Sequence, residues 1–311
     1  MISWTRVLGA CAALALLAVS PVAAAPNNLI VFGDSLVDGG NVSIASGGTT
    51  PNPAQGYYAG RFSNGFVASD VLNLAIEGTP SVPSLAGGDN YAFGGARARN
   101  DGLSVPDVAA QVSSYMAVTG GIADPNSLYL INAGGNDVFD ILSGGSASTI
   151  ISAAVTAIVT QVSVLQAAGA QYILVAGVGN VGGTPSAIAA GATAQAAGLA
   201  LSQQLTNALF AALPSNVYTL DVIGLFNAVG ANPAAYGLPA GINLTNACLG
   251  SGTPDPAGPP TCTNYAFFDT IHPTTQVANI LGTAMVTIVP EPGTASLLVV
   301  GLAGLALRRR A

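Results

Sequence analysis

Short apolar runs alternate with longer stretches of helical spacing along most of this 311-residue chain. Apolar runs bounded by glycine or polar residues are typical of buried strands, and they occur at 29–32, 90–96, 127–132, 172–177 and 217–222. Apolar residues at helical spacing predict helices over 66–76, 105–118, 149–168, 186–212 and 274–288, with a short helix ending near 229. Such alternation requires right-handed crossovers and a parallel sheet covered on both faces. The pattern therefore predicts an α/β fold, a three-layer αβα sandwich with about five parallel strands.

The first 25 residues have the layout of a cleaved secretory signal. They hold one arginine, an apolar run from Val7 to Val19 and small residues at 23–25. A transmembrane anchor is the alternative, but the apolar run is short for a bilayer. We therefore predict that residues 1–25 are a signal peptide and that 26–289 form one domain.

Charged residues make up only 7% of the chain, and lysine is absent. Four of the seven arginines lie in the terminal segments, which leaves Arg61, Arg97 and Arg99 in the central part. Thirteen acidic residues oppose these three, so the central part carries a net charge of −10. Nucleic-acid binding needs clustered cations, and the composition therefore excludes a nucleic-acid partner.

Two of the three cysteines, Cys248 and Cys262, remain once the signal containing Cys11 is set aside. An even number of cysteines in an exported chain indicates a disulfide. Closing a loop of about 15 residues contributes roughly 3 kcal/mol in the chain-entropy model. Two free thiols are the alternative.

Ser35 follows the first apolar run directly, after Gly33 and Asp34. This places its hydroxyl at the carboxyl edge of a strand, where open α/β sheets bind their ligands. A serine at the start of a helix commonly caps it instead, and this is the alternative for Ser35.

His272 is the single histidine of the chain, and Asp269 stands three residues before it. Serine becomes a nucleophile near neutral pH when a base takes its proton and a third group orients that base. Asp269 is close enough in sequence to reach the imidazole, and Pro273 suits the first position of a following helix. These residue types predict a Ser-His-Asp triad of Ser35, His272 and Asp269.

Four segments of the chain resemble the conserved blocks of the GDSL (SGNH) esterases and lipases, in the order in which that family has them. They are Gly33–Leu36 continued to Asn41, Asn90–Ala96, Gly134–Asp137 and Asp269–Pro273. The resemblance implies the flavodoxin-like SGNH hydrolase fold, Ser35 as nucleophile, His272 as base and Asp269 as its orienting acid. It also implies an oxyanion hole of the Ser35 N–H, a Gly94 or Gly95 N–H and the Asn136 amide. No metal or organic cofactor is implied.

A long loop, 43–65, is rich in Gly, Pro, Ser and Thr and carries Tyr57, Tyr58 and Phe62. Long loops beside active sites commonly bind ligands. We therefore name the three aromatic residues as candidates for substrate binding in an acyl or aryl pocket, with plain surface packing as the alternative. Asp137 and Asp140 are interpreted as charges at the start of a helix rather than metal ligands.

Residues 290–311 resemble the PEP-CTERM sorting tail of Gram-negative bacteria that make exopolysaccharide. Pro290-Glu291-Pro292 is followed by an apolar stretch, 295–307, and three arginines. The resemblance implies export, transient contact with the inner membrane and cutting by an exosortase-type enzyme. The mature protein would then be extracellular or associated with the cell surface or exopolysaccharide. A C-terminal membrane anchor is the physical alternative, though the span is short.

These features together predict a secreted serine hydrolase that cleaves carboxylic esters, an esterase or lipase with a small-molecule or lipid ester as substrate. A polysaccharide O-acetyl esterase acting on exopolysaccharide shares the chemistry and is the first alternative. A non-catalytic matrix protein on the same fold is the second.

Overall fold

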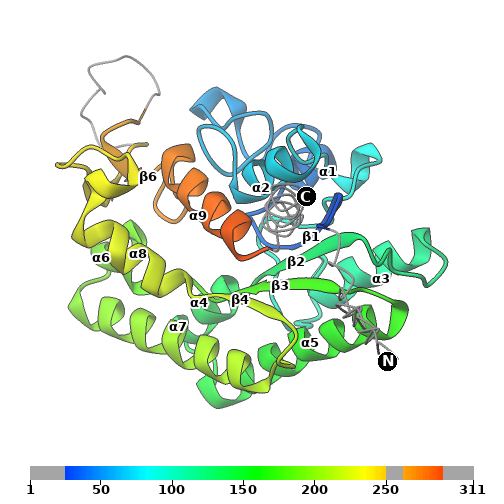
Figure 1. Ribbon diagram of the computed structural model, residues 1–311. Coiled ribbons are helices and arrows are strands. Elements are labelled where there is room, and N and C mark those ends of the chain that lie inside the picture. The colour runs from blue at the N-terminus through cyan, green and yellow to red at the C-terminus, as the bar shows by residue number, and fades with distance from the viewer. Residues whose placement is uncertain (1–24, 250–261, 290–311) are drawn as a thin grey trace, which may run out of the picture. The chain divides into compact units, whose positions relative to one another are not determined.

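The computed structural model describes residues 25–249 and 262–289 and is built on a four-stranded parallel sheet. Strands β1 (Asn28–Gly33), β2 (Ser127–Asn132), β3 (Tyr172–Ala176) and β4 (Tyr218–Leu220) lie in that order across the sheet (Figure 1). Each strand pairs in parallel with the next, from Asn28 opposite Ser127 to Ala176 opposite Leu220. The predicted α/β class and the parallel sheet are therefore confirmed.

Helices cover both faces of this sheet (Figure 1). Alternate strand residues such as Phe32 and Ile131 point to one face, where α3 (Val108–Val118), α5 (Ala147–Ala168) and α7 (Ala192–Ala212) pack. Their neighbours, such as Val31 and Leu130, point to the other face, which α2 (Ala68–Glu77), α9 (Thr275–Ile288) and α8 (Val222–Ala231) cover. α5 is long and apolar enough to cross a bilayer, yet it buries Ile158 and Val162 in the first of these cores.

The predicted strand over 90–96 is an irregular edge segment instead. Its backbone follows β1, because the Tyr91 and Phe93 N–H groups donate to the carbonyls of Val31 and Gly33 at 2.8 and 3.0 Å. The Asn90 side chain then accepts from the Ala92 N–H, and Gly95 takes a φ of 84°. These two features turn the chain away from the sheet before a regular strand can form.

The predicted helix over 186–212 is two helices, α6 (Pro185–Ala189) and α7. Gly191 separates them with a φ of 97°, a conformation that interrupts a right-handed helix. The remaining helices, α1 (Asn41–Ala45) and α4 (Gly135–Leu142), directly follow the turns after β1 and β2. Four short 3₁₀ segments lie in the connections of the described chain, at Pro53–Gln55, Ser84–Ala86, Val181–Gly183 and Pro233–Tyr236.

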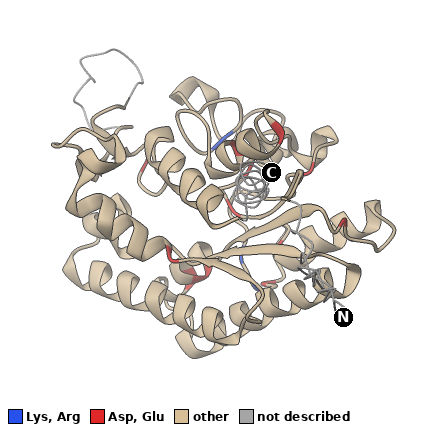
Figure 2. Cartoon of the chain, in the orientation of Figure 1, with Lys and Arg blue, Asp and Glu red and all other residues tan. Residues whose placement is uncertain are grey.

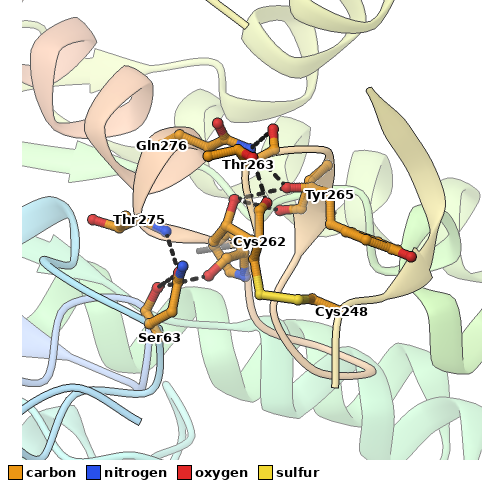
Figure 3. The surroundings of a disulfide bond; sticks show 11 residues. Ser63, Cys248, Cys262, Thr263, Tyr265, Thr275 and Gln276 are labelled. Atoms are coloured by element: carbon orange, nitrogen blue, oxygen red, sulfur yellow. Dashed lines mark hydrogen bonds between the residues drawn. A yellow bond between two sulfur atoms is a disulfide. The ribbon is translucent and has the colours of Figure 1, made fainter. Parts of the chain in front are cut away.

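A small second sheet, formed by β5 (Asn243–Ala247) and β6 (Tyr265–Phe267), leads the chain back to its last helix. Cys248 and Cys262 form a disulfide beside it with Cα atoms 5.8 Å apart, so the predicted pairing is confirmed (Figure 3). The Gln276 side chain of α9 donates to the carbonyls of Cys262 and Tyr265. Disulfide and amide together fix the segment from which β6 begins.

Every arginine in the described part of the chain is paired with an aspartate, and Figure 2 shows how few cationic residues there are. Arg61 binds Asp70 at 2.9 Å, Arg99 binds Asp137 at 2.6 Å, and Arg97 binds Asp140 at 2.9 Å. The described residues therefore offer no cluster of free cations to a polyanion.

Candidate active site

Ser35 lies in a sharp turn at the carboxyl end of β1. The backbone there is fixed, because Gly33 exchanges hydrogen bonds with the Gln111 side chain and the Asp34 N–H donates to the Asn132 carbonyl at 3.1 Å. A side chain at Gly33 would place its Cβ 2.2 Å from that same carbonyl oxygen, so only glycine fits. The next helix starts at Asn41, so Ser35 caps no helix.

Ser35, His272 and Asp269 form one hydrogen-bonded chain. The His272 Nε2 lies 2.8 Å from the Ser35 Oγ, and its Nδ1 lies 2.6 Å from the Asp269 Oδ2. The structure thus brings together two segments that are 237 residues apart in sequence. One nitrogen can take a proton from the hydroxyl while the other is held by the carboxylate, which is the arrangement of an activated serine.

Asp269 is held as a carboxylate by the groups around it. Burial by itself raises the pKa of this carboxyl, but hydrogen bonds from the ring and backbone of His272 and from Tyr57 outweigh burial and lower the pKa to about 2. Its Oδ1 accepts the N–H groups of Ile271 and His272 at 2.8 and 2.6 Å. The carboxylate therefore fixes the backbone of the turn as well as the imidazole ring.

The turn that carries His272 is closed by the backbone rather than by the following helix. The Phe268 N–H donates to the His272 carbonyl at 2.8 Å, and the Thr274 N–H donates to the Ala266 carbonyl at 2.9 Å. The prediction that Pro273 opens the helix is wrong, because α9 begins at Thr275 after its N-cap Thr274. His272 is thus held in a hairpin-like turn that precedes the helix, and not at the start of the helix as expected.

The predicted oxyanion donors differ in whether their N–H groups already donate to an acceptor within the protein. The Gly94 N–H donates to the Asp38 Oδ2 at 2.9 Å. Gly95 carries a φ of 84°, and its N–H has no acceptor among the described residues. The Asn136 Nδ2 donates to the Ala96 carbonyl at 2.8 Å, which uses one of its two hydrogens. A Gly95 N–H and one Asn136 hydrogen therefore remain for a ligand.

Two arginines tie the segment of Gly95 to the helix that carries Asn136. Asp137 lies in the first turn of α4, and its side chain is buried against Arg99 and the Ala98 N–H, which donates at 2.7 Å. Asp140, one turn later, accepts from Arg97 and Arg99. The two aspartates therefore bind arginines and set the relative position of Gly95 and Asn136.

Asp34, next to the serine, is a buried carboxyl that the sequence analysis did not single out. It is 4% exposed, and burial raises its pKa to about 7, although the Leu36 N–H and the nearby imidazole oppose the rise. Asp34 could have been found from the sequence, because it lies in the Gly-Asp-Ser turn. A side chain at the carboxyl end of such a strand lies close to the crevice where ligands bind.

The three loop aromatics lie at different distances from the reacting groups. Tyr57 donates its hydroxyl to the Asp269 Oδ2 at 2.6 Å. The Phe62 ring lies 5.1 Å from the imidazole, centroid to centroid. Tyr58 is 46% exposed and packs against Phe66. That they bind substrate stays a prediction, and the contact between Tyr57 and Asp269 was not foreseen.

A cavity of about 290 Å³ opens beside Ser35 and Asn136. Its walls come from the turns after β1 and β2, from the segment after β3, from α4, α8 and α9, and from the second sheet with the turn that carries His272. They do not include Tyr57, Tyr58 or Phe62. The glycine-rich stretch 177–183, which follows a buried strand, could have pointed to these walls by the same strand-edge argument that found Ser35.

Comparison with known proteins finds one family match in the central part of the chain and another in its C-terminal segment. A model of the family described as GDSL-like lipase/acylhydrolase matches residues 29–285, and one of the PEP-CTERM protein-sorting motif matches residues 289–310. Lipase 1 of Photorhabdus luminescens is 40% identical over 174 residues, which are 56% of this chain and 25% of that protein. Esterase EstA of Pseudomonas aeruginosa is 30% identical over 324 residues, with 84% of this chain and 47% of that protein covered.

The chain spans between a quarter and about half of the length of the first curated relatives it matches. Among solved structures, a carbohydrate acetylesterase family member from Sinorhizobium meliloti covers 84% of this chain and 96% of its own, at 16% identity and a TM-score of 0.44. A lipolytic G-D-S-L family member from Veillonella parvula covers 84% and 97%, at 12% identity and a TM-score of 0.44.

Proposed function

Because this chain belongs to the GDSL-like lipase/acylhydrolase family, we propose that it hydrolyses carboxylic esters with Ser35 as nucleophile. The observation that carries the proposal is the continuous path from the Ser35 Oγ through His272 to Asp269, at 2.8 and 2.6 Å. An unactivated serine would not need an imidazole and a partly buried carboxylate in line behind it.

The reaction follows the order of proton transfers that this path allows. His272 Nε2 takes the hydroxyl proton as the Ser35 Oγ attacks the carbonyl carbon, and it then gives this proton to the departing alcohol. Water repeats the sequence on the acyl-enzyme, and the acid is released. Asp269 remains ionised throughout, and it orients and stabilises the imidazolium.

The tetrahedral intermediate needs donors for its oxyanion. We assign this role to the Ser35 N–H, the Gly95 N–H and the second Asn136 hydrogen. Gly94 is set aside because its N–H already binds Asp38. Asp38 in turn accepts from the Gly40 and Asn41 N–H groups at 2.7 Å, so it is a rigid part of the scaffold.

The variant Ser35→Ala tests the assignment. We expect kcat for p-nitrophenyl acetate to fall by roughly three or more orders of magnitude, as for other triad nucleophiles, and labelling by a fluorophosphonate probe to disappear. Ser114→Ala is the matched control, because that hydroxyl is exposed and bonds only to the Ala110 carbonyl of its own helix. Full turnover by Ser35→Ala would refute the assignment. Absence of probe labelling in the wild type would instead favour the non-catalytic matrix protein.

The polysaccharide O-acetyl esterase is the second candidate, and the sorting motif favours it through its link to exopolysaccharide. Both candidates use the same catalytic groups, so they differ only in what the site accepts. Release of acetate from an acetylated exopolysaccharide, compared with hydrolysis of simple esters at equal enzyme concentration, separates them.

The PEP-CTERM match indicates export in a Gram-negative bacterium. We propose that residues 1–25 are removed as a signal, that 26–289 form the hydrolase domain, and that an exosortase-type enzyme cuts the 290–311 segment after transient contact with the inner membrane. Both terminal segments, except for residue 25, lie outside the described residues. The intact mass of protein recovered outside the cells tests this, since an unshortened C-terminus would contradict the cut.

A further inference from the structure

The aromatic ring of Phe62 lies beside the imidazole of His272, with the two ring centroids 5.1 Å apart. We propose that Phe62 is a positioning residue of the triad, because its ring holds the imidazole in line with Ser35 and stabilises the imidazolium that forms during the reaction. The proposal rests on the proposed ester hydrolysis. It gives Phe62 a role in proton transfer, which differs from the predicted role in substrate binding.

The rings of Phe62 and His272 are stacked obliquely. Their planes are 36° apart, so the rings do not meet edge-on, and at 5.1 Å they are too close to lie side by side in one plane. The imidazole therefore lies against the face of the Phe62 ring. Such a face carries partial negative charge and attracts a cation within about 6 Å of the ring centroid. Protonation of His272 therefore strengthens the contact.

The same ring packs against Gly94, in the segment of the proposed oxyanion donor. A Cβ at Gly94 would lie 2.2 Å from the Phe62 Cε2 and 2.5 Å from its Cζ, so the ring occupies the space that a side chain would need. Gly95, in contrast, is required for its φ of 84°. The two glycines thus serve different purposes. Phe62 connects the imidazole of His272 with the segment that carries Gly95.

The residues on both sides of Phe62 fix its backbone. Arg61, directly before it, forms an ion pair with the buried Asp70 of α2 at 2.9 Å. Ser63, directly after it, donates its hydroxyl to the Pro273 carbonyl at 2.9 Å. The loop is therefore bound to α2 on one side and to the turn that carries the histidine on the other. A ring attached to this backbone has a defined position relative to the imidazole.

Among the described residues, three titratable side chains act on His272 besides this ring. Asp269 binds its Nδ1, and Tyr57 acts through that carboxylate. Asp34, in the turn after β1, interacts with the imidazole electrostatically. All three are the same in every variant compared below, so a difference between the variants reports the ring of Phe62.

Replacement of Phe62 by phenylalanine with one, two and three ring fluorines tests the contact. Fluorine withdraws negative charge from the ring face and leaves the shape of the ring nearly unchanged. The imidazolium is then stabilised less, so we expect the acid limb of kcat/KM for p-nitrophenyl acetate to move stepwise to lower pH, by roughly 0.5 to 1 pH unit in total. We expect kcat to fall about three- to tenfold over the series. Phe62→Leu, which lacks the ring, should show at least the full shift.

Gly94→Ala displaces the ring without changing Phe62, because the added Cβ would meet the Phe62 Cε2. We expect the acid limb to move to lower pH here too, with little further change when Gly94→Ala is combined with Phe62→Leu, since leucine lacks Cε2 and Cζ. Phe66→Leu is the matched control. It makes the same substitution in the same part of the chain, at a ring that contacts Tyr58 rather than His272, and it should keep the wild-type limb.

The outcomes distinguish this proposal from the proposed function. An acid limb that stays at the wild-type pH along the fluorinated series, or moves to higher pH, would overturn the role of Phe62, whatever happens to kcat or to the melting temperature. If Ser35→Ala abolishes hydrolysis in that case, the triad stands without it. If Ser35→Ala retains activity, the proposed catalytic function itself is refuted. Fluorophosphonate labelling gives the concentration of active enzyme in each variant except Ser35→Ala.

Discussion

The hydroxyl of Tyr57 and the imidazole of His272 bind the same carboxylate oxygen of Asp269, each at 2.6 Å. Burial and the neighbouring carboxylate raise the pKa of the Tyr57 phenol, so it stays protonated and donates. The Tyr57 ring is fixed edge-on against Phe268, with centroids 4.9 Å apart. We therefore treat Tyr57 as a positioning residue that acts on the triad through Asp269.

Tyr57→Phe keeps the ring and removes the hydroxyl. Activity of the wild type should fall on acidification, because the triad needs an imidazole that can accept the proton of the serine. In the variant the carboxylate has lost one donor and attracts the imidazolium more strongly, so this acid limb of kcat/KM should move to higher pH. We also expect kcat to fall about tenfold, the scale of one hydrogen bond to a charged group.

Tyr58→Phe is the control for this experiment, because Tyr58 is exposed and its ring contacts Phe66 rather than the triad. A purely structural role for Tyr57 would lower the melting temperature and leave the acid limb where it is in the wild type. An unmoved limb in Tyr57→Phe would therefore contradict the positioning role, whatever happens to kcat.

At the scale of elements, the sequence was enough to predict those strands and helices whose apolar residues follow a single clear spacing. The buried runs at β1, β2 and β3 and the long helix α5 are set by apolar spacing, which is a local property. The break at Gly191 was missed because the residues on both sides favour a helix, and one glycine is tolerated inside many helices. The edge segment after Asn90 was missed because its path also depends on a distant side chain, the Asn41 amide, which donates to the Asn90 and Ala92 carbonyls.

The candidate site likewise contains some residues that could be predicted from the sequence and others that could not. Ser35, Asp269 and His272 could be found because their chemistry demands particular residue types, and the His272–Asp269 spacing is local. The role of Tyr57 could not be found, since its partner is 212 residues away and nothing in the loop sequence specifies it. Of the cavity, only the stretch 177–183 after β3 could have been found from the sequence, because the other walls come from elements that only the fold brings together.

The disulfide is the element-scale feature with the clearest energetic consequence. Cys248 and Cys262 are 14 residues apart, and a loop of this size contributes roughly 3 kcal/mol to the free energy of unfolding. The double variant Cys248→Ala/Cys262→Ala should lose about that much in denaturant unfolding. Its activity should fall as well, because the bridge precedes β6 and the turn that carries Asp269.

Reduction provides the control for this loss. Dithiothreitol should lower the midpoint of unfolding of the wild type and leave that of the double variant unchanged. Titration of two free thiols in the folded, untreated protein would show instead that the cysteines are not paired.

At the scale of the whole molecule, buried carboxyl groups give stability an unusual dependence on pH. Burial raises the pKa of Asp34 to about 7, and burial also raises the pKa of Asp38 and Asp137. A carboxyl whose folded pKa is raised stabilises the fold most at pH values below its unfolded pKa, and this stabilisation is lost as the pH rises through the folded pKa. Asp269, with its pKa lowered to about 2, acts in the opposite sense and destabilises the fold only below about pH 4.

The free energy of unfolding should therefore be highest near pH 4 to 5 and decline towards pH 8. Asp34→Asn removes one titrating group while keeping an acceptor for the Leu36 N–H, which now lies 3.0 Å from the Asp34 Oδ1. Between pH 5 and pH 8 the variant should gain about 2–3 kcal/mol in the free energy of unfolding relative to the wild type. Urea unfolding at both values measures this difference.

Asp221→Asn is the control, because Asp221 caps α8 at the surface and its side chain accepts only the Gly224 N–H. It removes the same unit of negative charge, so it accounts for the general repulsion within an acidic protein. If both variants gained equally between pH 5 and pH 8, the cause would be net charge rather than the burial of Asp34. A gain confined to Asp34→Asn would show that the carboxyl beside the nucleophile is kept at a cost to stability, in the pH range where the triad works.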